Sequence, residues 1–123
     1  MTRTILIVED VDLCAATLEI ALLTLPDLIV QSATSAEEAW QFLLGGGISA
    51  LITDIHLPKM DGFELIQRIR SQPRFTRLPI LVISGDSDPA TPGRLQSLGA
   101  DAYFSKPYSP AEVRARLEQL IHV

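Results

Sequence analysis

Five side chains able to bind a metal ion or a phosphate group stand at the ends of four separate apolar runs. They are Glu9, Asp10, Asp54, Ser84 and Lys106. If the apolar runs are parallel strands, their carboxyl ends share one edge of a sheet, which is where ligands bind in such sheets. We therefore expect these five side chains to lie close together.

Three of the five are carboxylates, which repel one another and would rise in pKa unless a cation neutralises them. Mg²⁺ is a small, hard ion that prefers oxygen ligands and keeps coordination positions for water and phosphate. The sequence therefore predicts Mg²⁺ as the cofactor. A tetrahedral zinc site is poorly supported, because the chain has one cysteine, Cys14, and two histidines, His56 and His122.

A lysine and a hydroxyl beside a metal-bound carboxylate are the groups that phosphoryl transfer requires. Asp54 would attack the phosphorus in line, while Lys106, Ser84 and the cation would stabilise the charge on the transferring oxygens. The product would be an acyl phosphate on Asp54.

Short apolar strands and amphipathic helices alternate along the chain and would position these groups. Five strands alternating with five helices predict a parallel sheet with helices on both faces, which is a doubly wound, three-layer α/β fold. We expect strands at 4–8, 28–33, 50–54, 79–84 and 102–105, and helices at 13–25, 36–43, 62–69, 92–98 and 110–121. The fourth helix has two possible starts, Pro89 and Pro92.

Pro26-Asp27 closes the first expected helix, which is indicated by residues that recur at helical spacing: Leu13, Thr17, Leu18, Ala21, Leu22 and Leu25. Ser35 and Glu38 have the spacing of a capping box at the start of the second helix. The glycines of 45–47 end that helix. They precede a strand, so they are not read as a phosphate-binding loop.

The composition indicates one domain, residues 1–123, with 47% hydrophobic residues and a formal net charge of -5. That charge gives no general attraction to nucleic acid or to an anionic membrane. No apolar run approaches the roughly 20 residues of a membrane span, and the start of the chain has no signal-peptide pattern. With no partner for Cys14, a reducing cytoplasm is the expected location.

Four arginines lie within ten residues of one another, at positions 68, 70, 74 and 77. Charged clusters of this kind near a helix end are usually a solvated face. We interpret them in that way and assign them no function.

Taken in order, these features resemble the receiver domain of two-component response regulators, the CheY-like family. The markers are the acidic pair after the first strand, Asp54 with the following 57–62 segment, Ser84 after the fourth strand, and Lys106-Pro107 after the fifth. The match covers nearly all 123 residues. It implies a flavodoxin-like strand order of 2-1-3-4-5, which the sequence pattern alone leaves open, and a cis bond before Pro107.

The resemblance also implies individual roles. Asp54 would be the phosphoacceptor, and Glu9, Asp10 and the backbone carbonyl of His56 would complete the protein ligands of the metal. Lys106 would pair with a phosphoryl oxygen and Ser84 would donate a hydrogen bond to another.

Three further side chains have implied roles with open alternatives. Tyr103 occupies the position of the family's switch aromatic, although it is also a plausible edge-strand aromatic. His56 and Asp86 occupy the positions that tune the lifetime of the phosphoryl group. A histidine two residues after a metal-bound aspartate also suggests a ligand, but we favour a side chain at the rim, with only the carbonyl used.

As a receiver domain, the chain would be a signalling switch that assists its own phosphotransfer and autodephosphorylation, not a metabolic enzyme. Its partners would be a sensor histidine kinase or a histidine phosphotransfer protein and a downstream output domain or target protein. A homodimer through the face of helix 92–98, strand 102–105 and helix 110–121 is a further expectation. Direct binding of nucleic acid or membrane is not expected.

Two other functions remain open. A phosphohydrolase of the haloacid dehalogenase type also uses an aspartate, a lysine and Mg²⁺, but it carries a second acid where this chain has His56, and it usually needs a cap domain. A binding module with a receiver fold would act without phosphorylation, against which the intact acidic set argues. A nucleotide-binding flavodoxin-like domain lacks support, because no glycine-rich loop joins a strand to a helix.

Overall fold

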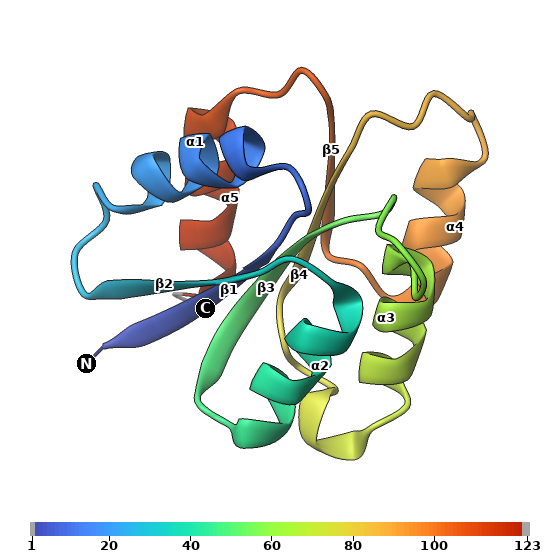
Figure 1. Cartoon of the computed structure of the whole chain (residues 1–123), viewed down its shortest axis with the longest axis horizontal. Helices are drawn as coiled ribbons and strands as arrows, with labels where there is room; N and C mark the ends of the chain where they lie inside the picture. Colours follow the sequence, from blue (N-terminus) through green and yellow to red (C-terminus); the bar gives the residue numbers. More distant parts are fainter. Residues whose placement is uncertain (1, 122–123) are drawn as a thin grey trace.

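A computed structural model describes residues 2–121 of the chain (Figure 1). The elements in order are β1 (Arg3–Val8), α1 (Asp12–Leu22), β2 (Leu28–Ala33), α2 (Ala36–Gly45), β3 (Ile48–Asp54), α3 (Gly62–Arg70), a short 3₁₀ helix (Pro73–Phe75), β4 (Ile80–Ser84), α4 (Thr91–Leu98), β5 (Ala102–Ser105) and α5 (Pro110–Ile121). The strands form one sheet in the order β2-β1-β3-β4-β5, and every neighbouring pair is parallel. The predicted doubly wound fold and its strand order are confirmed.

The central strands are covered on both faces, which is why their sequences are almost continuously apolar. The register places Ile7 of β1 beside Ile52 of β3, and Thr53 of β3 beside Val82 of β4. All four side chains are fully buried. Because the strands are parallel and in register, their carboxyl ends reach the same edge.

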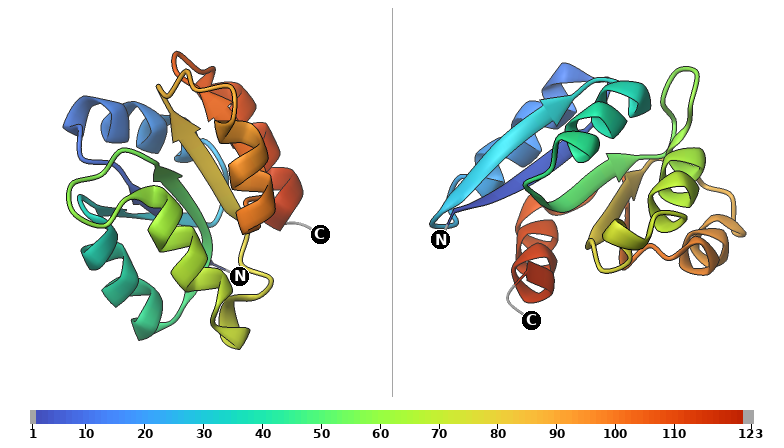
Figure 2. Two further views of the ribbon diagram at one scale, coloured as in Figure 1. Left: turned by 90° about the vertical axis from the view of Figure 1, so that its right-hand side faces the viewer. Right: turned by 90° about the horizontal axis from the view of Figure 1, so that it is seen from below.

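Two layers of helices complete the fold, as the two views of Figure 2 show together with Figure 1. Leu18 and Leu22 of α1 and Val113 and Leu117 of α5 bury their side chains on one face of the sheet. Helices α2, α3 and α4 cover the opposite face. Within residues 2–121, no helix combines the length and the apolar character needed to cross a membrane.

Side-chain hydrogen bonds cap the starts of α2 and α3, and the cap of α2 is the predicted one. The Ser35 hydroxyl accepts a hydrogen bond from the Glu38 amide at 3.1 Å, and the Glu38 carboxylate accepts one from the Thr34 amide at 2.9 Å. Asp61 caps α3 in the same way, accepting from the Glu64 amide at 2.9 Å. These bonds satisfy amides that have no partner within the helix.

The prediction for α1 was wrong at its end, and one residue of the helical pattern does not face the sheet. Leu13 is 76% exposed, and the helix stops at Leu22. Leu18 is fully buried, and Leu13 lies five residues earlier, which places it about 140° around the helix. Leu13 therefore points to solvent while Leu18 faces the sheet.

The interpretation of the arginine cluster was wrong for Arg70, whose side chain is 18% exposed. Its guanidinium donates twice to the Gly99 carbonyl, at 3.0 and 2.9 Å, and once to the Phe75 carbonyl at 2.8 Å. It also pairs with Asp101 at 3.1 Å, and Asp101 in turn accepts from the Ile80 amide at 2.8 Å. Arg70 thus joins the end of α3 to the segments that enter β4 and β5.

Two other arginines of the cluster cover aromatic rings at the same end of the molecule. Trp40 meets Phe75 edge to face, with ring centroids 6.0 Å apart. The guanidinium of Arg68 lies 5.7 Å from the Trp40 ring, and that of Arg74 lies 4.8 Å from the Phe75 ring. These contacts fasten α2 and α3 to the 3₁₀ helix before β4.

Candidate functional site

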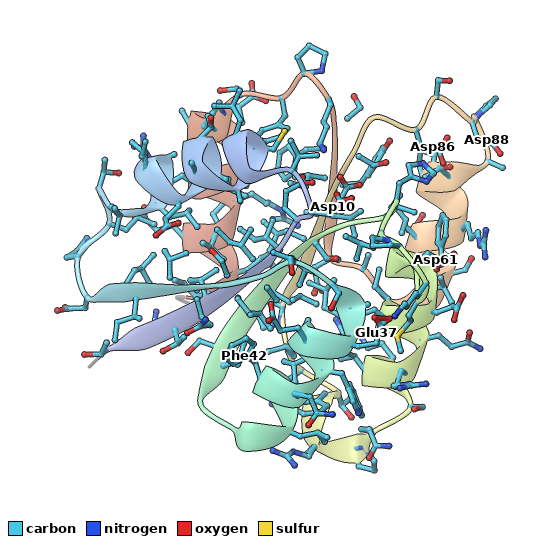
Figure 3. The ribbon with its side chains drawn as sticks, in the orientation of Figure 1. Asp10, Glu37, Phe42, Asp61, Asp86 and Asp88 are labelled. Atoms are coloured by element: carbon cyan, nitrogen blue, oxygen red, sulfur yellow. The ribbon has the colours of Figure 1, made fainter. Side chains whose placement is uncertain are left out.

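The carboxyl ends of β1, β3, β4 and β5 bring the predicted site residues to one edge of the sheet. Glu9 follows β1, Asp54 ends β3, Ser84 ends β4 and Lys106 follows β5. Asp10 stands next to Glu9 and is exposed. Figure 3 labels it near the centre of the view, where β1 ends. Parallel strands in register are sufficient to explain this convergence.

Asp54 is 5% exposed and is held by three hydrogen-bond donors. One carboxylate oxygen, Oδ1, accepts from the amides of Ile55 at 2.6 Å and His56 at 3.2 Å. The other oxygen, Oδ2, accepts from the ammonium of Lys106 at 2.7 Å. The carboxylate is therefore fixed in one orientation at the end of its strand.

Glu9, Asp10 and Asp54 form a compact acidic group. Each offers a carboxylate oxygen, and these oxygens lie within 4.8 Å of one another. Burial is the main cause that raises the pKa of Glu9; the hydrogen bond from Lys106 opposes the rise, and the charge of Asp54 adds to it. Oxygen ligands at this spacing suit Mg²⁺.

Lys106 is paired within the site and is not a solvated lysine. Its ammonium lies 3.0 Å from Glu9 and 2.7 Å from Asp54. Burial acts to lower the pKa of Lys106, but the hydrogen bonds to Asp54 and Glu9 outweigh it and hold the pKa well above its usual range. The bond between Lys106 and Pro107 is cis, as the resemblance implied.

The acidic group has more negative charge than Lys106 can neutralise. With Glu9, Asp10 and Asp54 ionised, one ammonium leaves an excess of two negative charges. A divalent cation would balance this excess and relieve the repulsion among the carboxylates. The residues present therefore fit the predicted metal by charge, by donor type and by spacing.

Asp86 connects several groups of the loop that follows β4. Its amide donates to the buried Ser84 hydroxyl at 3.0 Å, and its carbonyl accepts from the Tyr103 hydroxyl at 3.3 Å. Its carboxylate accepts from the Asp88 amide at 2.9 Å and from the Thr91 hydroxyl at 3.0 Å. These bonds, led by the one from Asp88, lower the pKa of Asp86.

The two predicted switch residues are thus joined through one intervening residue. Tyr103 is half-buried, and its ring packs against the core beneath α2, α3 and α4. Burial raises the pKa of the Tyr103 hydroxyl. Asp86 therefore hydrogen-bonds to both predicted switch residues.

The side chain of His56 lies at the rim of the site. It is 65% exposed, and its Nε2 atom lies 3.6 Å from Oδ2 of Asp86. This position agrees with the rim interpretation of the side chain, while the metal-binding role of the His56 carbonyl stays a prediction. His122 lies outside the described residues.

Two residues that support the site were missed by the sequence reasoning. A Cβ atom at Gly62 would collide with the Asp54 carbonyl oxygen and would come within 2.7 Å of the Ile55 Cα, so only glycine allows α3 to start so close to β3. The Glu37 carboxylate accepts a hydrogen bond from the Met60 amide at 3.1 Å. Gly62 lies in the 57–62 segment after Asp54 and could have been identified, whereas the Glu37 contact spans 23 positions and leaves no local signal.

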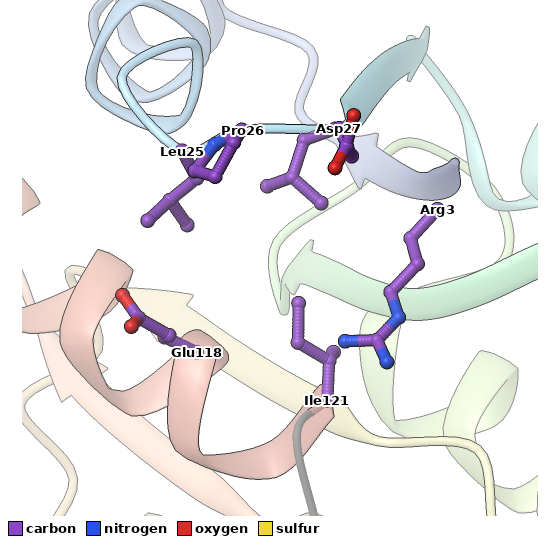
Figure 4. Close-up of a pocket in the computed structure, with 7 residues that line it drawn as sticks. Arg3, Leu25, Pro26, Asp27, Glu118 and Ile121 are labelled. Atoms are coloured by element: carbon purple, nitrogen blue, oxygen red, sulfur yellow. The ribbon is translucent and has the colours of Figure 1, made fainter. Parts of the chain in front are cut away.

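A cavity of about 410 Å³ lies at the other end of the sheet, where β1 and β2 begin (Figure 4). Arg3, Leu25, Asp27, Glu118 and Ile121 are among the residues that line it. It contains none of the predicted site residues. The acidic group, and not this cavity, therefore remains the candidate functional site.

Comparison with known proteins points to one family. The family model described as the response regulator receiver domain matches residues 5–118. Chemotaxis protein CheY1 of Helicobacter pylori is 31% identical over 93 residues, covering 75% of each chain. The crystal structure of a putative response regulator from Chloroflexus aurantiacus has a TM-score of 0.92 and 34% identity, covering 100% of both chains.

Some relatives are much longer than this chain. Protein RcaC of Microchaete diplosiphon is 34% identical over 100 residues, which are 76% of this chain but 15% of RcaC. The chain spans less than half the length of most of the curated relatives that it matches. The similarity therefore concerns the receiver domain alone, and it does not extend to the activities of the longer proteins.

Proposed function

Because the chain belongs to the family of response regulator receiver domains of two-component systems, we propose that Asp54 accepts a phosphoryl group from a phosphohistidine in a magnesium-dependent reaction. The observation that carries this proposal is the setting of Asp54. It is a buried carboxylate held by the amides of Ile55 and His56 and by Lys106, beside two further acids.

These side chains can support a direct transfer of the phosphoryl group from a histidine to Asp54. A carboxylate oxygen of Asp54 attacks the phosphorus, the bond from phosphorus to the histidine nitrogen breaks, and the electron pair returns to the imidazole. Lys106, already 2.7 Å from Asp54, is in place to pair with a phosphoryl oxygen. Ser84 would donate a hydrogen bond to another oxygen. Attack of water on the acyl phosphate would reset the domain.

The acidic group supports Mg²⁺ as the cofactor. Glu9, Asp10, Asp54 and the backbone carbonyl of His56 would be the protein ligands of the ion. When bound, the ion supplies positive charge to the transferring phosphoryl oxygens. The charge excess of the three carboxylates supports this assignment.

The switch would run through the bonds of Asp86. Movement of the Ser84 hydroxyl toward the phosphoryl group would break its bond with the Asp86 amide and so change the support of the Tyr103 hydroxyl. Tyr103 lies on β5, so the surface of α4, β5 and α5 would change its affinity for a partner. His56 and Asp86, 3.6 Å apart over the site, would tune the lifetime of the phosphoryl group.

The proposal extends to the partners and to the extent of the domain. Receiver domains pair with histidine kinases or phosphotransfer proteins, and one of these would donate the phosphoryl group. An output domain or target protein, or a second copy of the chain, would bind the α4, β5 and α5 surface. We take residues 1–123 as one receiver domain and, because Cys14 is unpaired, place it in the reducing cytoplasm.

The test is the intact mass of the protein after incubation with a small acyl phosphate or phosphoramidate. We expect a gain of one phosphoryl group that requires both Mg²⁺ and Asp54, with Asp54→Asn and a chelator as the two controls. No gain under any condition would instead favour a phosphorylation-independent binding module. Turnover of a generic phosphomonoester would favour a hydrolase.

A further inference from the structure

The loop between β3 and α3 is held in its middle by a side chain from α2. The carboxylate of Glu37, in the first turn of α2, accepts a hydrogen bond from the backbone amide of Met60 at 3.1 Å. Glu37 is half-buried. Figure 3 labels it between α2 and α3, and labels Asp61 at the start of α3. The contact joins two elements that the chain connects only through β3.

The remainder of the loop is tied to one carbonyl. The Ile55 carbonyl accepts from the Leu57 amide at 3.1 Å and from the Gly62 amide at 2.7 Å, which closes the loop at its base. Residues 58–61 project beyond that closure. Within them, the hydrogen bond from the Met60 amide to Glu37 crosses to α2, and the Met60 side chain packs against the core on the same face of the sheet.

The backbone beside that contact is strained. Lys59 has a φ of 65°, in the left-handed region that side-chain-bearing residues rarely adopt. Such a conformation persists when its surroundings hold it in place. The adjacent Met60 amide, fixed by Glu37, is positioned to supply that restraint.

The same loop begins at the site. His56 is two residues after Asp54, and its amide already donates to the Asp54 carboxylate. Its carbonyl belongs to the peptide unit that leads into the restrained segment. The orientation of that carbonyl therefore depends on how firmly the loop beyond it is held.

We propose that Glu37 is a positioning residue for the metal site. By fixing Met60 it holds the loop that carries the His56 carbonyl, and so it sets the affinity of the acidic group for Mg²⁺. This inference rests on the proposed function, because it concerns the metal that Glu9, Asp10 and Asp54 would bind.

The adjacent residue provides a matched control. Glu38 lies in the same first turn of α2 and also accepts a backbone amide, but that amide belongs to Thr34 at the start of its own helix. Both acids favour the helix by facing its amino end. A comparison of Glu37→Ala with Glu38→Ala therefore separates the loop contact from effects on the helix.

The experiment measures Mg²⁺ affinity without phosphorylation, from the rise in melting temperature of the whole chain as Mg²⁺ is added. Glu37→Ala should weaken the apparent affinity about tenfold, as loss of a supporting contact does at other metal sites. Glu37→Gln keeps an oxygen acceptor and should stay within about twofold of the wild type. Glu38→Ala should do the same, although it lowers the melting temperature without metal.

Amide hydrogen exchange at Met60 provides the second measurement. The amide should be protected in the wild type, Glu37→Gln and Glu38→Ala, and should exchange faster in Glu37→Ala. Wild-type affinity or unchanged Met60 exchange in Glu37→Ala would overturn the inference while leaving the proposed function intact. A wild-type protein whose melting temperature does not respond to Mg²⁺ would overturn the proposed function, and this inference with it.

Discussion

The two edges of the sheet each hold a long cation next to carboxylates, yet the two arrangements differ in their charge balance. At the amino edge, Arg70 meets one carboxylate, Asp101, and its other donors go to backbone carbonyls. At the carboxyl edge, Lys106 meets Glu9 and Asp54, with Asp10 close by. The first cluster is complete within the chain, whereas the second has a surplus of acid.

The difference distinguishes an ion pair that stabilises the fold from an acidic group that is suited to bind a cation. A balanced, hydrogen-bonded ion pair lowers the energy of the folded state without need of a ligand. Carboxylates that outnumber the nearby cations repel one another and lower the stability of the folded state unless a cation binds. Such clusters are therefore typical of binding sites. Substitutions confined to one edge should therefore affect stability and cation binding separately.

The largest effect is expected from Arg70→Met. The substitution leaves the carbonyls of Gly99 and Phe75 and the Asp101 carboxylate without their donor, so the free energy of unfolding should fall by about 3 kcal/mol. Urea denaturation measures this loss. Arg70→Lys should recover little, because one ammonium cannot reproduce the planar fork of the guanidinium.

The Arg70→Met variant should still be phosphorylated. Phosphoryl gain per folded molecule, measured by intact mass at low temperature, should match the wild type because the acidic group is untouched. Loss of phosphorylation in folded Arg70→Met would show that the two edges are coupled and do not act independently.

The second effect is the response to Mg²⁺. A ligand at 100 times its dissociation constant raises the free energy of unfolding by about 2.7 kcal/mol. We expect this gain in the wild type and in Arg70→Met alike, and a much smaller gain in Asp54→Asn. Equal gains in all three proteins would place the ion outside the acidic group.

A smaller effect, with opposite signs in two buffers, is expected from Asp10→Asn. In chelator, removal of one of three repelling carboxylates should stabilise the protein by about 0.5 kcal/mol. In Mg²⁺ the variant should be less stable than the wild type, since it lacks one of the proposed metal ligands. Destabilisation in both buffers would mean that repulsion among the three carboxylates does not lower the stability of the metal-free protein.

The smallest effect concerns the pH dependence set by Asp86. Hydrogen bonds from Asp88 and Thr91 lower the pKa of Asp86 in the folded state. The unfolded state then binds the proton more readily, so this stabilisation is present above the ordinary aspartate pKa and is lost as pH falls through the lower folded value. Asp86→Asn should flatten the acid side of a plot of stability against pH, measured by urea denaturation below about pH 5. If the stability of Asp86→Asn depended on acid pH as the wild type does, Asp86 would not contribute to that dependence.

The sequence was sufficient for the layout of the fold and for the convergence of the acidic group. Apolar runs that end in Glu9, Asp54, Ser84 and Lys106 encode both the strands and the edge that they share. The strand order came only from the resemblance, because crossover patterns of equal length are compatible with several orders. The structure has the order that the resemblance implied.

The sequence was insufficient where the partner of a side chain lies far along the chain. Arg70 looked like part of a solvated face because Gly99 and Asp101 are about 30 positions away. The bond from Met60 to Glu37 was invisible for the same reason. Leu13 was counted in the helical pattern of α1, but its angle around the helix turns it to solvent.

The single tryptophan of the chain determines which events can be followed by fluorescence. Trp40 packs against Phe75 and under Arg68, in the layer of α2 and α3 and next to the entry of β4. Its emission should therefore change when that layer unfolds, which suits every denaturation curve above. Its emission should change little when an ion or a phosphoryl group binds at the opposite edge. An optical assay of signalling therefore needs a fluorescent reporter introduced at that edge.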